Sequence, residues 1–140
     1  TYKNLVDKYN RSIDSSIQEE LRPYCYKNKI TYLQYQILEV LFDDGALTIG
    51  DLSDKMSMDT GNMSAQCKRL EQKGYTMRLR KKFDERVVEV SLTRQGRLII
   101  TEMNDFLNKK YRNKWNGLDE QTKKKMLESY ETMVKLFTKK

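Results

Sequence analysis

The feature that most constrains the fold is a single change in hydrophobic period. Apolar and polar residues alternate from Tyr75 to Arg80 and again from Val88 to Leu92, on either side of the segment KKFDER, 81–86. Such alternation is typical of two strands of a β-hairpin. Elsewhere the apolar residues recur every three or four positions, which is the period of amphipathic helices. We therefore expect a mainly α protein with one small β-hairpin.

The helical stripes have recognisable starts and stops. Pro23 cannot donate a backbone hydrogen bond and is expected to end the first helix, while Gly45 and Gly74 suit the closing turns of the second and fourth. Thr48 is a suitable N-cap for the third helix. The expected helices are Leu5–Leu21, Tyr32–Asp43, a short one from Thr48, a second short one from Asp59 or Thr60 to Lys73, Gln95–Trp115, and a last one from Asp119.

The stretch MDTGNMSAQCKRLEQKG, 58–74, predicts an unusual helix. Met63, Cys67 and Leu70 have the spacing of a buried face. The opposite face is short, amide-rich and basic, and it consists of Gly61, Asn62, Ala65, Lys68, Arg69 and Gln72. Small residues permit close approach to a DNA groove, amides can read adenine, and Arg or Lys can reach guanine or phosphate. With the short helix before it, this segment predicts a helix-turn-helix. The alternative is that the outer face of the helix is polar only because it is solvated.

Charge is unevenly distributed along the chain. The 140 residues carry 27 basic and 20 acidic side chains, a net charge of +7. Residues 57–86 hold eight basic and four acidic residues, whereas the first 56 residues hold seven and nine. The excess therefore coincides with the predicted helix-turn-helix and hairpin, where phosphate contacts are expected. Residues 109–140 are also basic, with ten against four, and there we favour a solvated helix face.

Composition argues against several functional classes. The chain has no histidine, and Cys25 and Cys67 do not form a CxxC pair, so neither a nucleophile–histidine pair nor a zinc site of clustered Cys and His is expected. Six dispersed glycines do not make a phosphate-binding loop. No stretch has the length and apolarity of a membrane span, and no signal-peptide core is apparent. We expect a cytoplasmic protein without enzymatic activity, metal or cofactor.

The helix-turn-helix and hairpin region resembles a known protein family. The run from Leu47 to Gly96 is similar to the winged helix-turn-helix of the multiple antibiotic resistance regulator (MarR) family, whose signature is DxR at 84–86 followed by SLTxxG at 91–96. The segment ITYLQYQIL, 30–38, and the flanking long helices extend the resemblance over essentially the whole chain. MDTG and DERVVEVSLT are most similar to the organic hydroperoxide resistance and related thiol-based oxidation-sensing regulators.

The resemblance implies a bacterial, sequence-specific DNA-binding transcriptional regulator. It would be a homodimeric repressor on a pseudo-palindromic operator, with residues 31–93 as the winged helix-turn-helix and 1–30 with 94–140 as a helical dimerisation region, in one compact chain. A winged-helix protein-interaction or accessory module without sequence-specific DNA reading is the alternative. The resemblance places Thr60, Asn62, Ser64, Ala65, Lys68 and Arg69 near the major groove, Lys81 and Lys82 on phosphates, and Arg86, oriented by Asp84, at the wing tip in the minor groove.

Two signalling routes remain open. In the oxidation-sensing regulators a reactive cysteine lies at the position that corresponds to about Asp7, and this chain has no cysteine there. Two tyrosines bind that cysteine in those regulators. Tyr32 matches one of them, whereas Leu21 occupies the place of the other. Cys25 is a candidate relocated sensor, because nearby Arg22, Lys27 and Lys29 would favour its thiolate. Cys67 is expected to pack in the core. The other route is a small apolar or phenolic effector in a pocket lined by Tyr9, Tyr24, Tyr32, Tyr35 and Phe42, which could equally be ordinary core.

Overall fold

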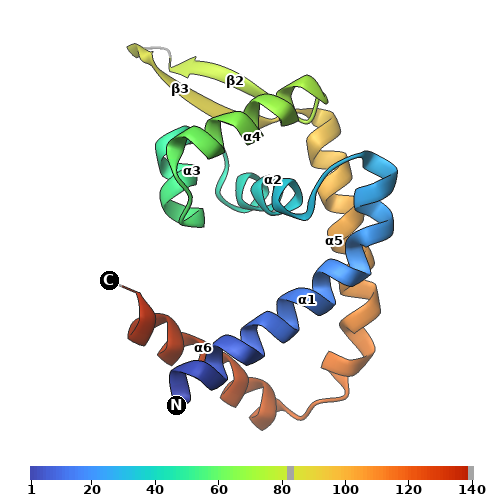
Figure 1. Cartoon of the computed structure of the whole chain (residues 1–140). Coiled ribbons are helices and arrows are strands. Elements are labelled where there is room, and N and C mark those ends of the chain that lie inside the picture. Colours follow the sequence, from blue (N-terminus) through green and yellow to red (C-terminus); the bar gives the residue numbers. More distant parts are fainter. Residues whose placement is uncertain (82–83, 139–140) are drawn as a thin grey trace. The chain divides into compact units, whose positions relative to one another are not determined.

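The computed structural model describes residues 1–81 and 84–138, with the backbone alone at 81 and 84–86. It confirms the mainly α architecture with a small β-sheet (Figure 1). The chain divides into two compact units, unit 1 (1–107) and unit 2 (108–140). The elements in chain order are α1 (Tyr2–Asn28), α2 (Tyr32–Asp44), β1 (Leu47–Thr48), α3 (Ile49–Met56), α4 (Thr60–Gln72), β2 (Thr76–Lys81), β3 (Asp84–Leu92), α5 (Arg94–Asn116) and α6 (Glu120–Phe137).

Helix α1 continues through Pro23, so the predicted stop at that residue is wrong. A proline inside a helix removes one backbone hydrogen bond and costs about 3 kcal/mol. Here the residues just beyond it, Tyr24 and Cys25, pack against the core of unit 1, and this burial offsets the cost. The helix ends instead at Lys29, which has a left-handed conformation with φ 55°.

The core of unit 1 draws on helices and sheet together. The middle of α2 contributes Ile37 and Leu38, both fully buried. They share one cluster with buried residues of α1, α3, α4, β3 and α5, namely Leu21, Leu52, Met63, Leu70, Val90 and Ile100. Because α4 contributes its inner face to this cluster, its outer face has a fixed orientation on unit 1.

The sheet is antiparallel, with the order β1-β3-β2. Strand β1 was not predicted, because two residues are too few to show a period; Leu47 pairs with Val90. The hairpin is longer than predicted, since β3 begins at Asp84 and β2 extends to Lys81, with an irregular register between Arg80 and Lys81. The prediction that 81–86 is all loop is therefore wrong, and Arg86 belongs to a strand. Residues 82 and 83 lie outside the described range.

The SLTxxG motif joins the hairpin to α5. The Thr93 hydroxyl donates to the carbonyl oxygen of Gly74 at 2.6 Å and accepts from the backbone N–H of Gly96 at 3.0 Å. The Thr93 N–H donates to the Tyr75 carbonyl at 3.1 Å. A Cβ atom added at Gly96 would lie 2.0 Å from that same carbonyl oxygen. Only glycine therefore allows α5 to approach the start of β2 this closely.

Unit 2 consists of the end of α5 together with α6. Asp119 caps α6 by accepting a hydrogen bond from the Thr122 N–H at 2.6 Å, and this bond lowers the pKa of the Asp119 carboxyl. Lys123 lies 5.5 Å from the ring centre of Trp115. None of the α6 residues is buried, and its large exposed apolar side chains are Met126, Leu127, Tyr130, Val134, Leu136 and Phe137. Among the described helices, none has the length and apolar character needed to span a membrane.

Candidate nucleic-acid interface

Helices α3 and α4 form the predicted helix-turn-helix. Thr48 caps α3 by accepting from the Asp51 N–H at 3.0 Å, and α3 ends at Ser57, which has φ 53°. The chain then turns into α4, whose N-cap is Asp59; its carboxylate accepts from the Asn62 N–H at 2.7 Å. Both caps satisfy backbone N–H groups that a helix start leaves unpaired. The turn between the two helices is therefore set by local hydrogen bonding.

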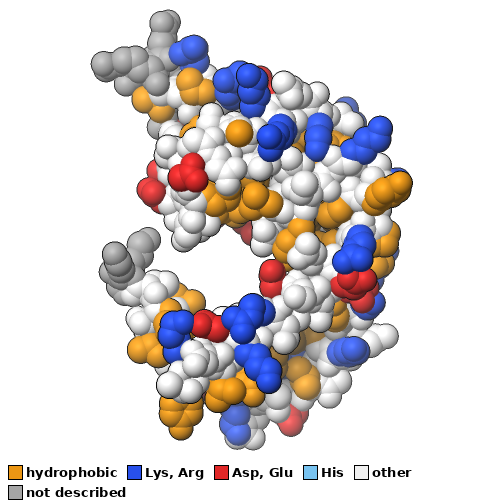
Figure 2. All heavy atoms as spheres, viewed as in Figure 1, with side chains coloured by type: hydrophobic (Ala, Val, Ile, Leu, Met, Phe, Trp, Pro, Cys, Tyr) orange, Lys and Arg blue, Asp and Glu red, His pale blue; other side chains and the backbone are white. Residues whose placement is uncertain are grey.

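The two faces of α4 have opposite character, as predicted. Met63, Cys67 and Leu70 are buried, with exposures of 0%, 3% and 0%. The outer face is free of large apolar residues, and Lys and Arg side chains gather over this part of unit 1 (Figure 2). All six predicted major-groove residues on it are exposed: Thr60, Asn62, Ser64, Ala65, Lys68 and Arg69. At helical spacing, Ala65, Lys68 and Arg69 lie opposite the buried stripe, whereas Thr60 and Ser64 lie on one flank of this face and Asn62 on the other.

The basic residues around α4 differ in what they already bind. Arg78 of β2 forms an ion pair with Glu71 at 2.7 Å. The Lys73 ammonium donates to the Lys29 carbonyl oxygen and to the Gln34 side chain. Within the described part of the chain, Lys68 and Arg69 form no ion pair.

The wing predictions fall largely outside the described atoms. Lys82 lies outside the described residues. The side chains of Lys81, Asp84 and Arg86 also lie outside them, although their backbones belong to β2 and β3. Their assignment to phosphates and the minor groove therefore stays a prediction from the DxR motif.

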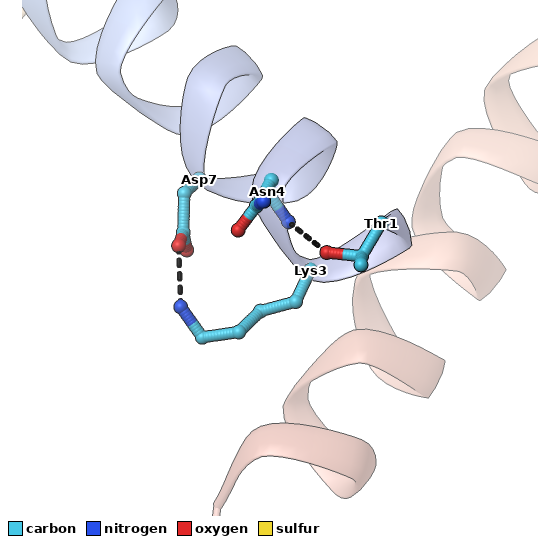
Figure 3. Close-up of polar contacts among 4 residues, drawn as sticks. All are labelled: Thr1, Lys3, Asn4 and Asp7. Carbon is cyan, nitrogen blue, oxygen red and sulfur yellow. Dashed lines mark hydrogen bonds and ion pairs between the residues drawn. The ribbon is translucent and has the colours of Figure 1, made fainter.

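The position expected for a sensor cysteine is occupied by an ion pair. Asp7 lies one helical turn from Lys3, whose ammonium donates to the Asp7 carboxylate at 2.6 Å (Figure 3). This bond is the main reason that the pKa of Asp7 is lowered. The two tyrosine-partner positions also differ from each other: Leu21 is buried in the core, whereas the Tyr32 hydroxyl donates to Asp14 at 2.9 Å. This segment therefore holds a charged carboxylate in place of a thiol.

The two cysteines are poorly suited to form thiolates. Burial raises the pKa of the Cys67 thiol to about 11, in agreement with its predicted place in the core. Burial also raises the pKa of Cys25, so the expectation that neighbouring cations favour its thiolate is wrong. Two of those cations are paired elsewhere, Arg22 with Glu19 at 2.7 Å and Lys27 with Glu102 at 3.7 Å. The sensor role of Cys25 stays a prediction without this electrostatic support.

The five aromatic residues proposed for an effector pocket are distributed over several contacts. Tyr32 and Tyr35 stack with ring centres 5.8 Å apart, and Tyr24 packs against Phe106 at 4.9 Å. Tyr35 is a core residue, with its hydroxyl 2.9 Å from Glu39 Oε2 and 2.8 Å from Asn104 Oδ1. Burial is the main reason that the pKa values of Tyr32 and Tyr35 are raised.

The remaining two aromatic residues lie closer to solvent. Phe42 lies under the Arg97 guanidinium, and Tyr9 is exposed. A pocket of about 310 Å³ is lined by Pro23, Tyr24, Lys27 and Glu102, so of the five residues Tyr24 alone lines it.

The sequence analysis missed the contacts by which Gln34, Gln66 and Lys73 join α4 to the rest of unit 1. Gln34, only 2% exposed, donates from its amide to Gln66 of α4 at 3.1 Å. Lys73, counted only as a charge, contacts the end of α1. The one sequence signal for this arrangement was the position of Gln34 three residues after Thr31, because the two form a capping box at the start of α2.

A helix-turn-helix followed by an antiparallel hairpin defines a winged helix-turn-helix protein. The family model described as "MarR family" matches residues 30–88. The HTH-type transcriptional regulator SarZ of Staphylococcus epidermidis is 30% identical over 116 residues, which span 83% of this chain and 78% of SarZ. The chain therefore belongs to the MarR family, and it is a DNA-binding transcriptional regulator.

Other comparisons show a further relative in sequence and two proteins of similar fold. The organic hydroperoxide resistance transcriptional regulator of Bacillus subtilis is 36% identical over 81 residues, covering 58% of this chain and 55% of that protein. In fold, the chain is similar to FabT of Streptococcus pneumoniae, solved in complex with DNA, with a TM-score of 0.79, 24% identity and coverage of 97% and 96%. It is also similar to NadR, solved with 4-hydroxyphenylacetate, with a TM-score of 0.80, 22% identity and coverage of 96% and 94%. The relatives in sequence are transcriptional regulators rather than enzymes.

Proposed function

We propose that the chain is a homodimeric repressor that binds a pseudo-palindromic operator, with α4 in the major groove and the β2–β3 hairpin in the minor groove. The outer face of α4 supports this proposal most strongly. It combines small side chains, an amide and two cations without ion-pair partners in the described structure, and the buried stripe below holds it in place. A DNA groove requires this combination of close approach, hydrogen bonding and positive charge.

Each exposed residue of α4 has a chemical role in this proposal. Ala65 leaves room for the helix to approach the base edges, and the Asn62 amide can form two hydrogen bonds with adenine. Arg69 can do the same with guanine, or pair with a phosphate. Lys68 neutralises a phosphate, while the hydroxyls of Thr60 and Ser64, near the positive end of the helix dipole, are suited to phosphate oxygens.

The hairpin residues complete the interface. Lys81 and Lys82 are assigned to phosphates. Arg86 is assigned to the minor groove, where a narrow groove attracts a guanidinium, and Asp84 orients it. The family motif supports this assignment, together with the extension of both strands toward residues 81 and 84.

The helical region 1–30 with 94–140 is proposed as the dimerisation region. Three apolar residues of α1, Leu5, Tyr9 and Ile13, are exposed at helical spacing, and α6 exposes a longer apolar face. Surfaces of this kind on a monomer are typical of protein–protein contacts. A dimer also provides two recognition helices for the two halves of a pseudo-palindrome.

For the signal, we favour a small apolar or phenolic effector over oxidation of a cysteine. Burial raises the pKa of both thiols, which disfavours the reactive thiolate. The NadR structure, similar in fold, contains the phenolic 4-hydroxyphenylacetate, and Tyr24 lines a pocket in this chain. The expected cytoplasmic location belongs to the same proposal, since the chain's targets would be there.

A binding titration over a range of salt concentrations tests the function. Duplex DNA selected by the wild-type protein from a random library should be bound with an affinity that falls steeply between about 50 and 200 mM salt. Counterions released from the phosphates cause this dependence. Affinity that does not respond to salt, or failure to select any sequence, would favour the accessory-module alternative.

Substituting Ala65→Leu tests the placement of α4. The larger side chain should hold the helix away from the base edges and lower affinity for the selected duplex at least about tenfold. Folding should be unaffected, because Ala65 is exposed. Ala46→Leu is the matched control, since it makes the same change at an exposed position outside α4. Equal affinities of the two variants would contradict the placement.

Peroxide titration of the wild-type protein and of Cys25→Ser distinguishes the two signalling routes. Because burial raises the pKa of Cys25, micromolar peroxide should leave the DNA affinity of both proteins unchanged over minutes. Mass spectrometry reports whether either thiol is modified. Loss of binding in the wild-type protein that is absent in Cys25→Ser would identify Cys25 as the sensor and contradict our preference.

A further inference from the structure

The end of α4 is connected directly to the end of α1. Lys73 follows the last residue of α4, and its ammonium donates to the Lys29 carbonyl oxygen, just past the end of α1, and to Gln34 Oε1 at 3.0 Å. The Tyr75 hydroxyl donates to the Asn28 carbonyl oxygen at 3.3 Å. Lys73 and Tyr75, both in the segment between α4 and β2, therefore donate to carbonyl groups that the end of a helix leaves free.

A buried amide continues this connection toward the middle of α4. Gln34 accepts at Oε1 from the Thr31 N–H at 3.1 Å as well as from Lys73, and its Nε2 donates to Gln66 at 3.1 Å. With 2% exposure, Gln34 has little access to water that could replace these partners. Breaking one of the bonds would leave a buried polar group unpaired, which is costly. Helix α4 is therefore attached at Gln66 and at Lys73 to the junction between α1 and α2.

We propose that Lys73 is a positioning residue for DNA recognition, which sets the direction of α4 through Lys29 and Gln34 instead of binding a phosphate. The inference rests on the proposed function, because it assumes that α4 reads DNA. Two of the three ammonium N–H donors already have protein acceptors. In a helix of this length, a rotation of about 5° at one end displaces the other end by about 2 Å. Such a displacement breaks hydrogen bonds to base edges but leaves general attraction to phosphates intact.

The variant Lys73→Met tests this role, since it keeps the chain length and removes the ammonium. The probes are the duplex selected by the wild-type protein and a scrambled duplex of equal length, each titrated over a salt series well below the melting temperature. Affinity for the selected duplex should fall about tenfold, whereas affinity for the scrambled duplex and the salt slope stay unchanged. Lys73→Arg should restore the affinity, because a guanidinium can donate to both oxygens.

Lys68→Met is the matched control, because Lys68 is an exposed lysine within α4 itself. If Lys68 binds a phosphate, this variant should weaken both duplexes alike and reduce the salt slope by about one unit. The same behaviour in Lys73→Met would show that Lys73 is a phosphate contact and overturn the inference. An unchanged ratio of specific to non-specific affinity in Lys73→Met would overturn it as well.

The variant Tyr75→Phe provides a second test if Lys73→Met does not fold. It removes only the hydroxyl that bonds to Asn28 and keeps the ring in the core. A smaller loss of specific affinity, with unchanged salt slope, is expected; an unchanged specificity ratio would contradict the connection between α4 and α1. A wild-type protein that binds no DNA at low salt would overturn the proposed function itself, and the inference with it.

Discussion

Gly96→Ala is expected to destabilise unit 1 by about 3 kcal/mol or more. The added Cβ would lie 2.0 Å from the Tyr75 carbonyl oxygen, and the nearest atoms belong to the backbone, so no flexible side chain can move aside. To relieve the contact, α5 must separate from the start of β2. That movement breaks the Thr93 bonds to Gly74 and Tyr75 and exposes the buried residues Ile99 and Ile100.

Thermal and denaturant unfolding, followed by circular dichroism, would measure this effect. Gly50→Ala is the matched control, because a Cβ there meets only the Thr48 hydroxyl at 3.8 Å, an ordinary contact. Gly50 lies in α3, where alanine is favoured over glycine by roughly 0.5–1 kcal/mol, so the control should be neutral or slightly stabilised. If both variants had the same melting temperature as the wild-type protein, the close approach at Gly96 would not exist in solution.

Periodicity predicted the parts of the fold where long stretches obey one pattern. The buried stripe of α4 was found because Met63, Cys67 and Leu70 follow the helical spacing, and the structure buries all three. The prediction failed at Pro23, where local propensity favours a stop but packing of Tyr24 and Cys25 keeps the helix intact. It also failed at 81–86, because KKFDER shows no alternation of apolar and polar residues although Lys81 and Asp84 pair as strand residues.

At the candidate site, too, features that follow a periodic pattern were predicted, whereas features that depend on contacts across the fold were not. The exposed face of α4 was predicted from spacing alone, and the family signature marked Gly96 without giving its reason, which lies in a backbone contact with Tyr75. Pairwise contacts across the fold could not be predicted. The cations near Cys25 in sequence suggested a thiolate, but Arg22 and Lys27 pair with carboxylates while burial raises the pKa of the thiol. Lys73 likewise read as a charge for DNA, although its partners are Lys29 and Gln34.

The double substitution Leu127→Glu with Val134→Glu is expected to convert the proposed dimer into a monomer. Both side chains lie on the exposed apolar face of α6, at helical spacing, and neither belongs to the buried core. Four carboxylates would then face one another across the two copies and would have to be desolvated, which is strongly unfavourable. Sedimentation would measure the change in mass, and circular dichroism would show that the helices persist.

The same substitution should weaken binding to the selected duplex on the order of 10²-fold or more, because a monomer loses the second half-site and the high effective concentration that a dimer provides. Ser129→Glu with Thr132→Glu is the control, since it adds equal charge on the opposite side of α6 and should leave both mass and affinity nearly unchanged. If the apolar-face variant remained a dimer, this face of α6 would not be the interface. If it became a monomer but kept full affinity, one copy would be sufficient for recognition, and the assignment of two α4 helices to two half-sites would be wrong.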